Sequence, residues 1–127
     1  MAKPKQHAEH NEKLSLQLFA EKSFLDWANT TAFYAALHFV KCKILPGEYN
    51  GIHCTTIVDA MSALKCNNKH EVTAKMVKVV LPAIDRDYRY LLEQSSSARY
   101  REYLVSKHNA SLCQQKLAKI KGICCPE

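Results

Sequence analysis

The sequence contains few of the residues that interrupt helices and form turns, with three glycines and four prolines among 127 residues. Their scarcity argues against a fold built from hairpins and favours four or five long helices. The chain also lacks a glycine-rich phosphate loop, which excludes the common nucleotide-cradling motifs. The uncharged stretch between Asp26 and Lys41 is shorter than the ~20 residues that a bilayer-spanning helix needs, and His38 interrupts it. We therefore expect no membrane association.

The cysteines include no Cys-x2-Cys pair, so the sequence lacks the most recognisable zinc-binding spacing. The six cysteines are Cys42, Cys54, Cys66, Cys113, Cys124 and Cys125. Met1 to Lys13 is polar and lacks the apolar core of a secretion signal. These observations predict a cytoplasmic protein with reduced thiols and with neither a metal nor a cofactor.

The composition is that of one folded domain. A hydrophobic fraction of 47% over 127 residues is sufficient for a core of its own. The formal net charge is +6, and the isoelectric point is about 9.0. A basic chain favours an acidic partner such as RNA or a negatively charged protein, although a basic domain without such a partner has the same composition. We interpret residues 1–127 as a single domain with RNA as a candidate partner.

The stretch from Phe24 to Leu45 organises the rest of the chain. Apolar residues recur in it at helical spacing on two faces. One face is formed by Phe24, Trp27, Ala28, Thr31, Tyr34 and Ala35, and the other by Phe33, Leu37, Val40 and Ile44. A helix with two apolar faces must be covered on both sides. This helix is therefore predicted to be the interior member of a bundle, about 33 Å long.

The segments on either side of this helix carry weaker signals. Residues 1–10 are predicted to be a frayed terminus, and a first helix is predicted from about Glu9 to Ala20. Its inward side chains are expected to be Leu14, Leu18 and Phe19. The central helix is predicted to end at Pro46-Gly47, and a loop to continue through Asn50-Gly51.

Three further helical patterns follow. Thr56 and Asp59 resemble a capping box that opens a third helix. A fourth pattern runs from about Glu71 to Gln94, with a break at Pro82 because proline lacks the backbone donor that a helix needs. The segment from Ser95 to Tyr103 is predicted to be an irregular link.

The last helix is predicted to begin near Ser106 or Asn109. Its apolar stripe consists of Ala110, Cys113, Leu117 and Ile120. Residues 122–127 are predicted to form a short tail, in which Cys124 and Cys125 would be exposed and prone to oxidation.

Two segments of the chain carry a resemblance to a known family. Asp26-Trp27-Ala28, followed by Ala32-Phe33-Tyr34-Ala35-Ala36-Leu37-His38, is similar to the signature helix of HEPN domains (higher eukaryotes and prokaryotes nucleotide-binding), and His53 stands where this family commonly has a lone histidine. Asp87-Tyr88-Arg89 through Ser97-Ala98-Arg99-Tyr100 resembles the tyrosine-rich helix end and "ARY" segment of a bacterial and archaeal branch. The resemblance covers about Asn11 to Ile120. It implies an all-α, four- to five-helix, up-and-down bundle that forms a homodimer.

Arg101 and His108, with six residues between them, resemble the arginine–histidine motif of HEPN ribonucleases near the start of the last helix. A histidine side chain, with a pKa of ~6.5, exchanges protons at neutral pH, and arginine can bind a phosphate through two hydrogen bonds. The resemblance therefore implies a metal-independent endoribonuclease of toxin or RNA-processing type, with Arg101 and His108 as its catalytic residues. Glu102 departs from the Asn, Asp or His that usually follows the arginine in active members.

A second interpretation remains open because the family also includes non-catalytic members. The chain would then be a dimeric interaction module that docks a partner such as a nucleotidyltransferase-like antitoxin. In that case Arg99 or Arg101 would pair with an acidic side chain across a turn. The acidic candidates are Asp87, Glu93 and Glu102.

Basic and aromatic residues beside the motif suggest a nucleic-acid-binding surface. Arg99 and Lys107 are predicted to contact phosphates, and Tyr100 and Tyr103 to stack on bases. Tyr88, at helical spacing, is instead expected in the core. The lysines further along the last helix either extend this surface or form an ordinary solvated face; they are Lys116, Lys119 and Lys121.

The other candidate sites are possible metal ligands and reactive thiols, and each of these residues can also have an ordinary structural role. His38 and Cys42 are spaced i, i+4, which places two metal ligands side by side, and His53-Cys54 would complete a tetrahedral set. We interpret His38 and Cys42 instead as core or interface residues, because they lie on a largely apolar helix. Cys54 is the best candidate for a reactive thiol, since it follows a histidine near a helix start, whereas Cys113 is expected to be buried and inert.

Overall fold

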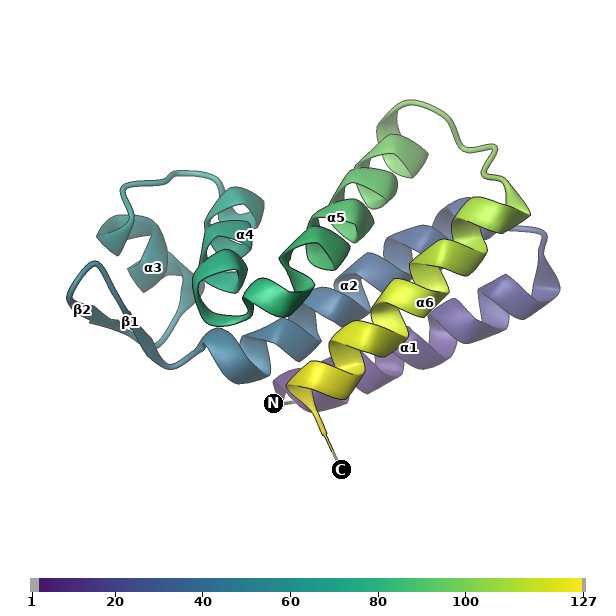
Figure 1. Cartoon of the computed structure of the whole chain (residues 1–127). Coiled ribbons are helices and arrows are strands. Elements are labelled where there is room, and N and C mark those ends of the chain that lie inside the picture. The colour runs from purple at the N-terminus through teal and green to yellow at the C-terminus, as the bar shows by residue number, and fades with distance from the viewer. Residues whose placement is uncertain (1–2, 127) are drawn as a thin grey trace.

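A computed structural model describes residues 3–126 of the chain, and it is almost entirely helical (Figure 1). This range contains six α-helices, one 3₁₀ turn and one two-stranded hairpin: α1 (Pro4–Glu21), α2 (Leu25–Ile44), β1 (Gly47–Tyr49), β2 (Ile52–Cys54), α3 (Ile57–Ala63), α4 (Lys69–Val80), η1 (Pro82–Ile84), α5 (Asp85–Tyr100) and α6 (Lys107–Cys124). The prediction of an all-α bundle is confirmed. Within the described residues, no helix combines the length and the apolar character needed to cross a bilayer.

Helix α2 is the interior member of the bundle, as the sequence predicted. Helices α1, α5 and α6 all pack along it (Figure 1). Twelve of its twenty residues are buried. The predicted face with Phe33, Leu37, Val40 and Ile44 is buried throughout. Tyr88 of α5 is also fully buried, and this confirms its predicted place in the core.

The prediction that Phe24 and Trp27 face inward is wrong. Their side chains are 55% and 52% exposed. Phe24 precedes the first residue of α2 and Trp27 lies in its first turn, where the chain still turns from α1 into α2. Helical spacing identifies a face but not the point along the helix at which the neighbouring helices stop covering it.

The prediction of a frayed segment over residues 1–10 is wrong for the described residues 3–10, because α1 already begins at Pro4. Proline is favoured in the first turn of a helix, and the backbone N–H of Lys3 donates to Gln6 Oε1 (2.9 Å). The inward face also differs from the prediction, since Leu14 is 40% exposed. Ser15 is buried in its place, and its hydroxyl donates to the carbonyl oxygen of Ala28 (2.8 Å).

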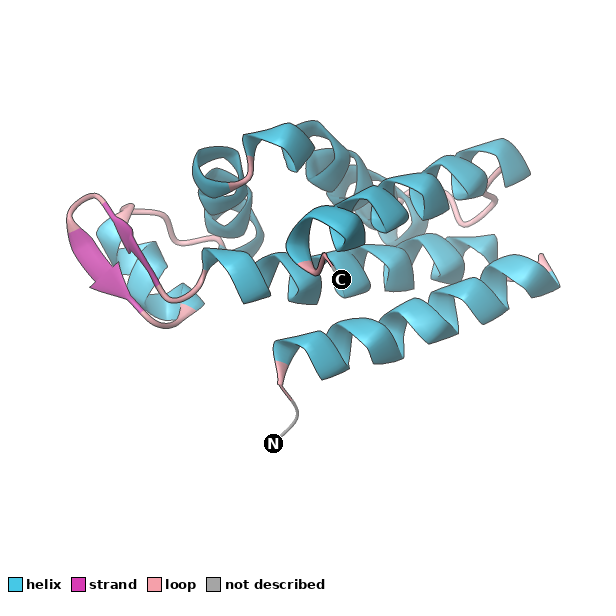
Figure 2. Ribbon diagram, turned by 60° about the horizontal axis from the view of Figure 1, so that its bottom comes forward, coloured by secondary structure: helices cyan, strands magenta, loops and turns pink. Residues whose placement is uncertain are grey.

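The segment predicted as a loop through Asn50 and Gly51 is a β-hairpin. Tyr49 pairs with Ile52, so Asn50 and Gly51 form a two-residue turn, with φ of 53° and 76°. Positive φ at both positions is the requirement of a type I′ turn, which asparagine and glycine meet best. The buried Tyr49 hydroxyl donates to the carbonyl oxygen of Ile44 and ties the hairpin to the end of α2. Figure 2 shows the hairpin beside α3, just beyond the end of α2.

Several helix boundaries agree with the sequence signals. The backbone N–H of Asp59 donates to Thr56 Oγ1 (3.1 Å), and the Asp59 carboxylate accepts from the backbone N–H of Thr56 (3.2 Å), which confirms the capping box of α3. The break at Pro82 is also confirmed, because η1 separates α4 from α5 there. The last helix, predicted to begin near Ser106 or Asn109, begins at Lys107, and its N-cap is Ser106, whose hydroxyl accepts from the backbone N–H of Asn109 (3.0 Å).

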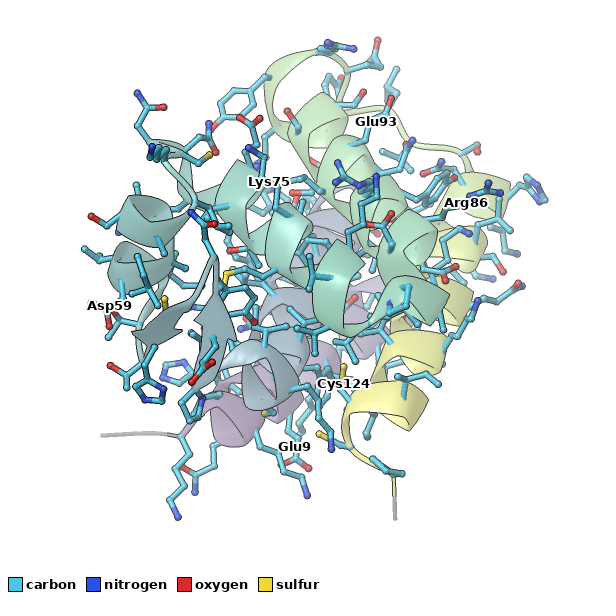
Figure 3. The ribbon with its side chains drawn as sticks, turned by 60° about the vertical axis from the view of Figure 1, so that its left-hand side comes forward. Glu9, Asp59, Lys75, Arg86, Glu93 and Cys124 are labelled. Carbon is cyan, nitrogen blue, oxygen red and sulfur yellow. The ribbon has the colours of Figure 1, made fainter. Side chains whose placement is uncertain are left out.

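Two predictions near the C-terminus are wrong. The segment from Ser95 to Tyr103 is not wholly irregular, because α5 continues to Tyr100; Ser95 and Ala98 are buried and extend its packed face. Residues 122–124 belong to α6 rather than to a tail, and Cys124 is buried (labelled in Figure 3). Residue 127 lies outside the described residues.

Candidate functional site

Arg101 and His108 flank the segment that joins α5 to α6, at the end of the bundle where α1 also turns into α2 (Figure 1). Arg101 caps the C-terminus of α5, where its backbone N–H donates to the carbonyl oxygen of Ser97 (2.9 Å). His108 is the second residue of α6. Both side chains belong to exposed residues, so the fold presents them to solvent at the same end of the molecule.

Of the acidic residues considered as partners of Arg101, Glu93 lines a hollow on α5 together with Arg101 but forms no ion pair with it, and the other two are engaged elsewhere. Glu102 folds onto its own segment and accepts from the backbone N–H of Leu104 (2.9 Å). Asp87 binds Lys116 (3.3 Å) and Lys119 (2.9 Å) of α6. Within residues 3–126 the guanidinium of Arg101 forms no ion pair. It is therefore available to bind a phosphate.

Arg99 differs from Arg101 because it has an internal partner. Its guanidinium donates to the hydroxyl of Tyr34 (2.6 Å) and lies over the rings of Tyr34 and Tyr100, at 5.5 and 5.2 Å. These contacts fix the end of α5 against α2. Tyr100 and Tyr103 are 78% and 68% exposed, so their rings remain accessible to an incoming base or partner.

Two lysines meet near the start of α6. Lys107 lies beside Lys22, the residue after α1, and the interaction with this neighbouring cation lowers the pKa of Lys107. Neither lysine has an acidic partner among the described residues. A phosphate between them would relieve this repulsion.

Exposed apolar side chains adjoin these cations. Phe24, Trp27, Tyr103 and Leu104 line a hollow of about 330 Å³ between the α1–α2 and α5–α6 connections, and Lys22 and Asp26 are the charged residues in its wall. We call the four apolar residues, with Lys22 and Lys107, the loop-end surface. The sequence predicted Tyr103 and Lys107 as surface residues but placed Phe24 and Trp27 in the core. Periodicity alone does not reveal that these two side chains lie beyond the part of α2 that the other helices cover.

Asn109 holds the first turn of α6 in place. Its side-chain oxygen accepts from the amide of Asn29 on α2 (2.8 Å). Its side-chain nitrogen donates to the Tyr90 hydroxyl (2.8 Å) and to Gln94 Oε1 (3.0 Å), both on α5. The sequence indicated Asn109 only as a possible helix start, and nothing in its spacing reveals these three partners. Because His108 and Lys107 precede it directly, Asn109 positions both.

Replacing Asn109 by alanine is expected to lower the free energy of unfolding by about 2–3 kcal/mol, because three polar side chains lose their partner in a half-buried place. Urea unfolding followed by circular dichroism measures the loss. Gln115→Ala is the matched control, since Gln115 is exposed on the same helix. Equal losses in the two variants would show that Asn109 has no special part in joining the helices.

The proposed metal and thiol sites are not assembled. Within the described residues, no group of three or more His, Cys, Asp or Glu side chains is arranged to hold a metal ion. Cys42 donates to the carbonyl oxygen of His38 in the preceding turn (3.5 Å), and His53 lies exposed on β2. Cys54 is buried, which argues against a reactive thiol. Cys113 is buried as predicted, and burial raises its pKa to about 12.

The ring of His38 is stacked on that of His7 from α1, with centroids 4.9 Å apart. Burial, followed by the charges of Lys41 and His7, lowers the pKa of His38 to about 4. Burial and the charges of Arg99 and Lys41 lower the pKa of His70 on α4 as well. The fold therefore favours the neutral forms of His38 and His70.

Acidification from pH 7 to pH 4.5 is expected to destabilise the protein. The folded-state pKa of His38, about 4, lies below the ~6.5 of an unfolded histidine, so the unfolded chain takes up a proton first. The stability due to neutral His38 is complete above pH 6.5 and is lost as the pH falls towards 4. Urea unfolding at several pH values measures how steeply the free energy of unfolding depends on pH. His38→Phe, which keeps a ring but does not titrate, should flatten this dependence, and an unchanged slope would contradict this assignment.

Comparison with known proteins adds no identification: no protein-family model, no curated protein and no solved structure matches this chain.

Proposed function

We propose that this chain is a HEPN-like protein that binds RNA and cleaves it without a metal ion at the α5–α6 end. The observation that carries the proposal is that Arg101 is exposed and without an ion pair in residues 3–126, at the same end of the bundle as exposed His108. The order and spacing of the two residues resemble the ribonuclease motif of that family. The loop-end surface, whose Lys107 precedes His108 in the chain, supplies cations for phosphates and rings for bases.

In this reaction His108 removes the proton from a ribose 2′-hydroxyl. The 2′-oxygen then attacks the adjacent phosphorus, and the bond from phosphorus to the 5′-oxygen of the next nucleotide breaks. The departing 5′-oxygen takes a proton from water, His108 returns its own proton to the solvent, and a 2′,3′-cyclic phosphate end remains. Arg101 binds the non-bridging oxygens of the phosphate and stabilises the charge that develops on them. Lys107 and Lys22 bind a neighbouring phosphate, and Tyr103 stacks on an unpaired base.

A second candidate function is a non-catalytic module that dimerises or docks a partner protein, such as a nucleotidyltransferase-like antitoxin. The exposed apolar side chains of the loop-end surface favour it, because aromatic residues at the surface commonly anchor protein interfaces. The two functions are compatible in a homodimer, in which this surface would bring two Arg101–His108 pairs together.

The test is incubation of purified protein with labelled single-stranded RNA in EDTA. Cleavage that leaves 2′,3′-cyclic phosphate ends is the expected result. Light scattering on the same sample measures the oligomeric state. If RNAs of several sequences all remain intact, the ribonuclease proposal is rejected. A dimer in the same sample would then support the interaction module.

A further inference from the structure

A second cavity lies at the opposite end of α2 from Arg101 and His108. Its volume is about 590 Å³, which is within the range of small-molecule sites. Residues from the start of α1, the last turns of α2 and the first turns of α3 and α4 line it. Asn29, which anchors α6, and Lys41, which lines the cavity, are twelve residues apart on α2, or about 18 Å along the helix. The cavity is therefore separate from the proposed RNA site.

The wall of the cavity is mainly apolar. The aliphatic side chains in it are Leu37, Leu45, Ile57 and Val58. They come from α2, from the residue after it, and from α3, so they form a surface on which a hydrocarbon or aromatic group can lie.

Five basic side chains share this cavity, and none of its described lining residues is acidic. They are His7, His38, Lys41, Lys69 and His70. Three helices contribute them, so they converge by folding rather than by proximity in the sequence. Lys69 and His70 also occupy the first turn of α4, where the helix dipole adds positive potential.

The environment of this cavity disfavours the protonated forms of Lys41, His38 and His70. Burial and the charge of Lys69 lower the pKa of Lys41, and burial is likewise the main cause of the lowered pKa of His38 and of His70. Charges of one sign without a partner destabilise a partly buried site. Lys41 and Lys69 form no ion pair among residues 3–126, and a bound anion would provide one.

We propose that this cavity binds a small organic anion whose acidic group lies between Lys41 and Lys69 and whose apolar body lies on the aliphatic wall. The acidic group is a phosphate, carboxylate or sulfonate, since each presents several oxygens to the two ammonium groups. The apolar body distinguishes this ligand from inorganic phosphate, which would leave the aliphatic wall in contact with water.

The probe for this site is 8-anilinonaphthalene-1-sulfonate, an aromatic anion whose fluorescence rises in an apolar environment. Titration into the folded protein is expected to give one saturable site. The neutral analogue N-phenyl-1-naphthylamine is expected to bind at least ~10-fold more weakly, because it lacks the group that the lysines bind.

The double variant Lys41→Met, Lys69→Met is expected to weaken sulfonate binding by about 10-fold or more. The matched control is Lys75→Met, Lys78→Met, which removes the same charge from exposed positions of α4 (Lys75 is labelled in Figure 3). Circular dichroism melts of both variants confirm that they fold. Trp27→Ala tests for binding at the loop-end surface and should change nothing.

Two results would overturn the proposal. Equal affinities in the two double variants would mean that the probe senses only net charge. Loss of binding in Trp27→Ala would place the probe at the other end of the bundle. Because no step of this titration involves RNA, its outcome is independent of the ribonuclease assay.

Discussion

Replacing His108 by alanine is expected to reduce the rate of RNA cleavage in EDTA by about 10²–10⁴-fold, which is the usual contribution of a general acid–base residue. The reason is that the 2′-hydroxyl would lose the group that accepts its proton, while Arg101 and the loop-end surface would still bind the substrate. RNA affinity, measured by fluorescence anisotropy, should therefore change little. A fall in rate without a fall in affinity would assign His108 to the chemical step.

His10→Ala is the matched control for this experiment, because His10 is also an exposed histidine and lies on α1. It should cleave RNA at the wild-type rate. Arg101→Lys is the companion variant: it keeps the positive charge but loses the planar pair of donors, so its rate should fall between those of wild type and His108→Ala. Cleavage that persists unchanged in His108→Ala would remove this residue from the mechanism.

Replacing Phe33 by alanine is expected to lower the free energy of unfolding by about 3–5 kcal/mol, the usual cost of deleting a buried phenyl ring. Phe33 is fully buried. Its ring contacts His70 of α4 (centroids 5.4 Å apart) and Tyr88 of α5 (5.7 Å apart). The cavity left by its removal would open between three helices that contribute to the same core. Urea or thermal unfolding measures the effect.

Phe24→Ala is the control, since it makes the same chemical change at a side chain that is 55% exposed. Its cost should stay below about 1 kcal/mol. Comparable losses at the two positions would mean that Phe24 is covered in the protein as it exists in solution, as expected if the loop-end surface is a dimer interface. A small loss at Phe33 would contradict the interior position of α2.

The parts of the fold that the sequence predicted are those with redundant signals. Helix α2 combines two apolar faces with Pro46 and Gly47 after its end, and α3 begins with a reciprocal cap between Thr56 and Asp59. Each of these features depends on neighbours in sequence. A local pattern is therefore enough to predict them.

The errors arose where tertiary contacts outweigh local preference. Ser95 is buried in α5 although serine favours helix ends, because its small side chain suits the packed face. Asn50-Gly51 was a readable hairpin signal, but the flanking strands of three residues are too short for a clear alternating pattern.

The candidate site was predicted only in part, for a similar reason. The spacing of Arg101 and His108 is visible in the sequence, and the structure places both at one end of the bundle. The contribution of Lys22 is not visible, because it is far from Lys107 along the chain and meets it only when α1 and α6 both pack on α2. The basic cavity was missed likewise, since its histidines come from three helices.

Small side chains along α2 have a consequence for how this protein can change. Ala28, Ala32, Ala35 and Ala36 are all completely covered, so the surrounding helices approach the backbone of α2 closely there. An extra methylene at any of the four would have to push a neighbour outwards. Substitutions should therefore be tolerated mainly at the two ends of α2. The loop-end surface and the basic cavity lie at these ends, so the ligand preference of each can be redesigned without changing the middle of the helix.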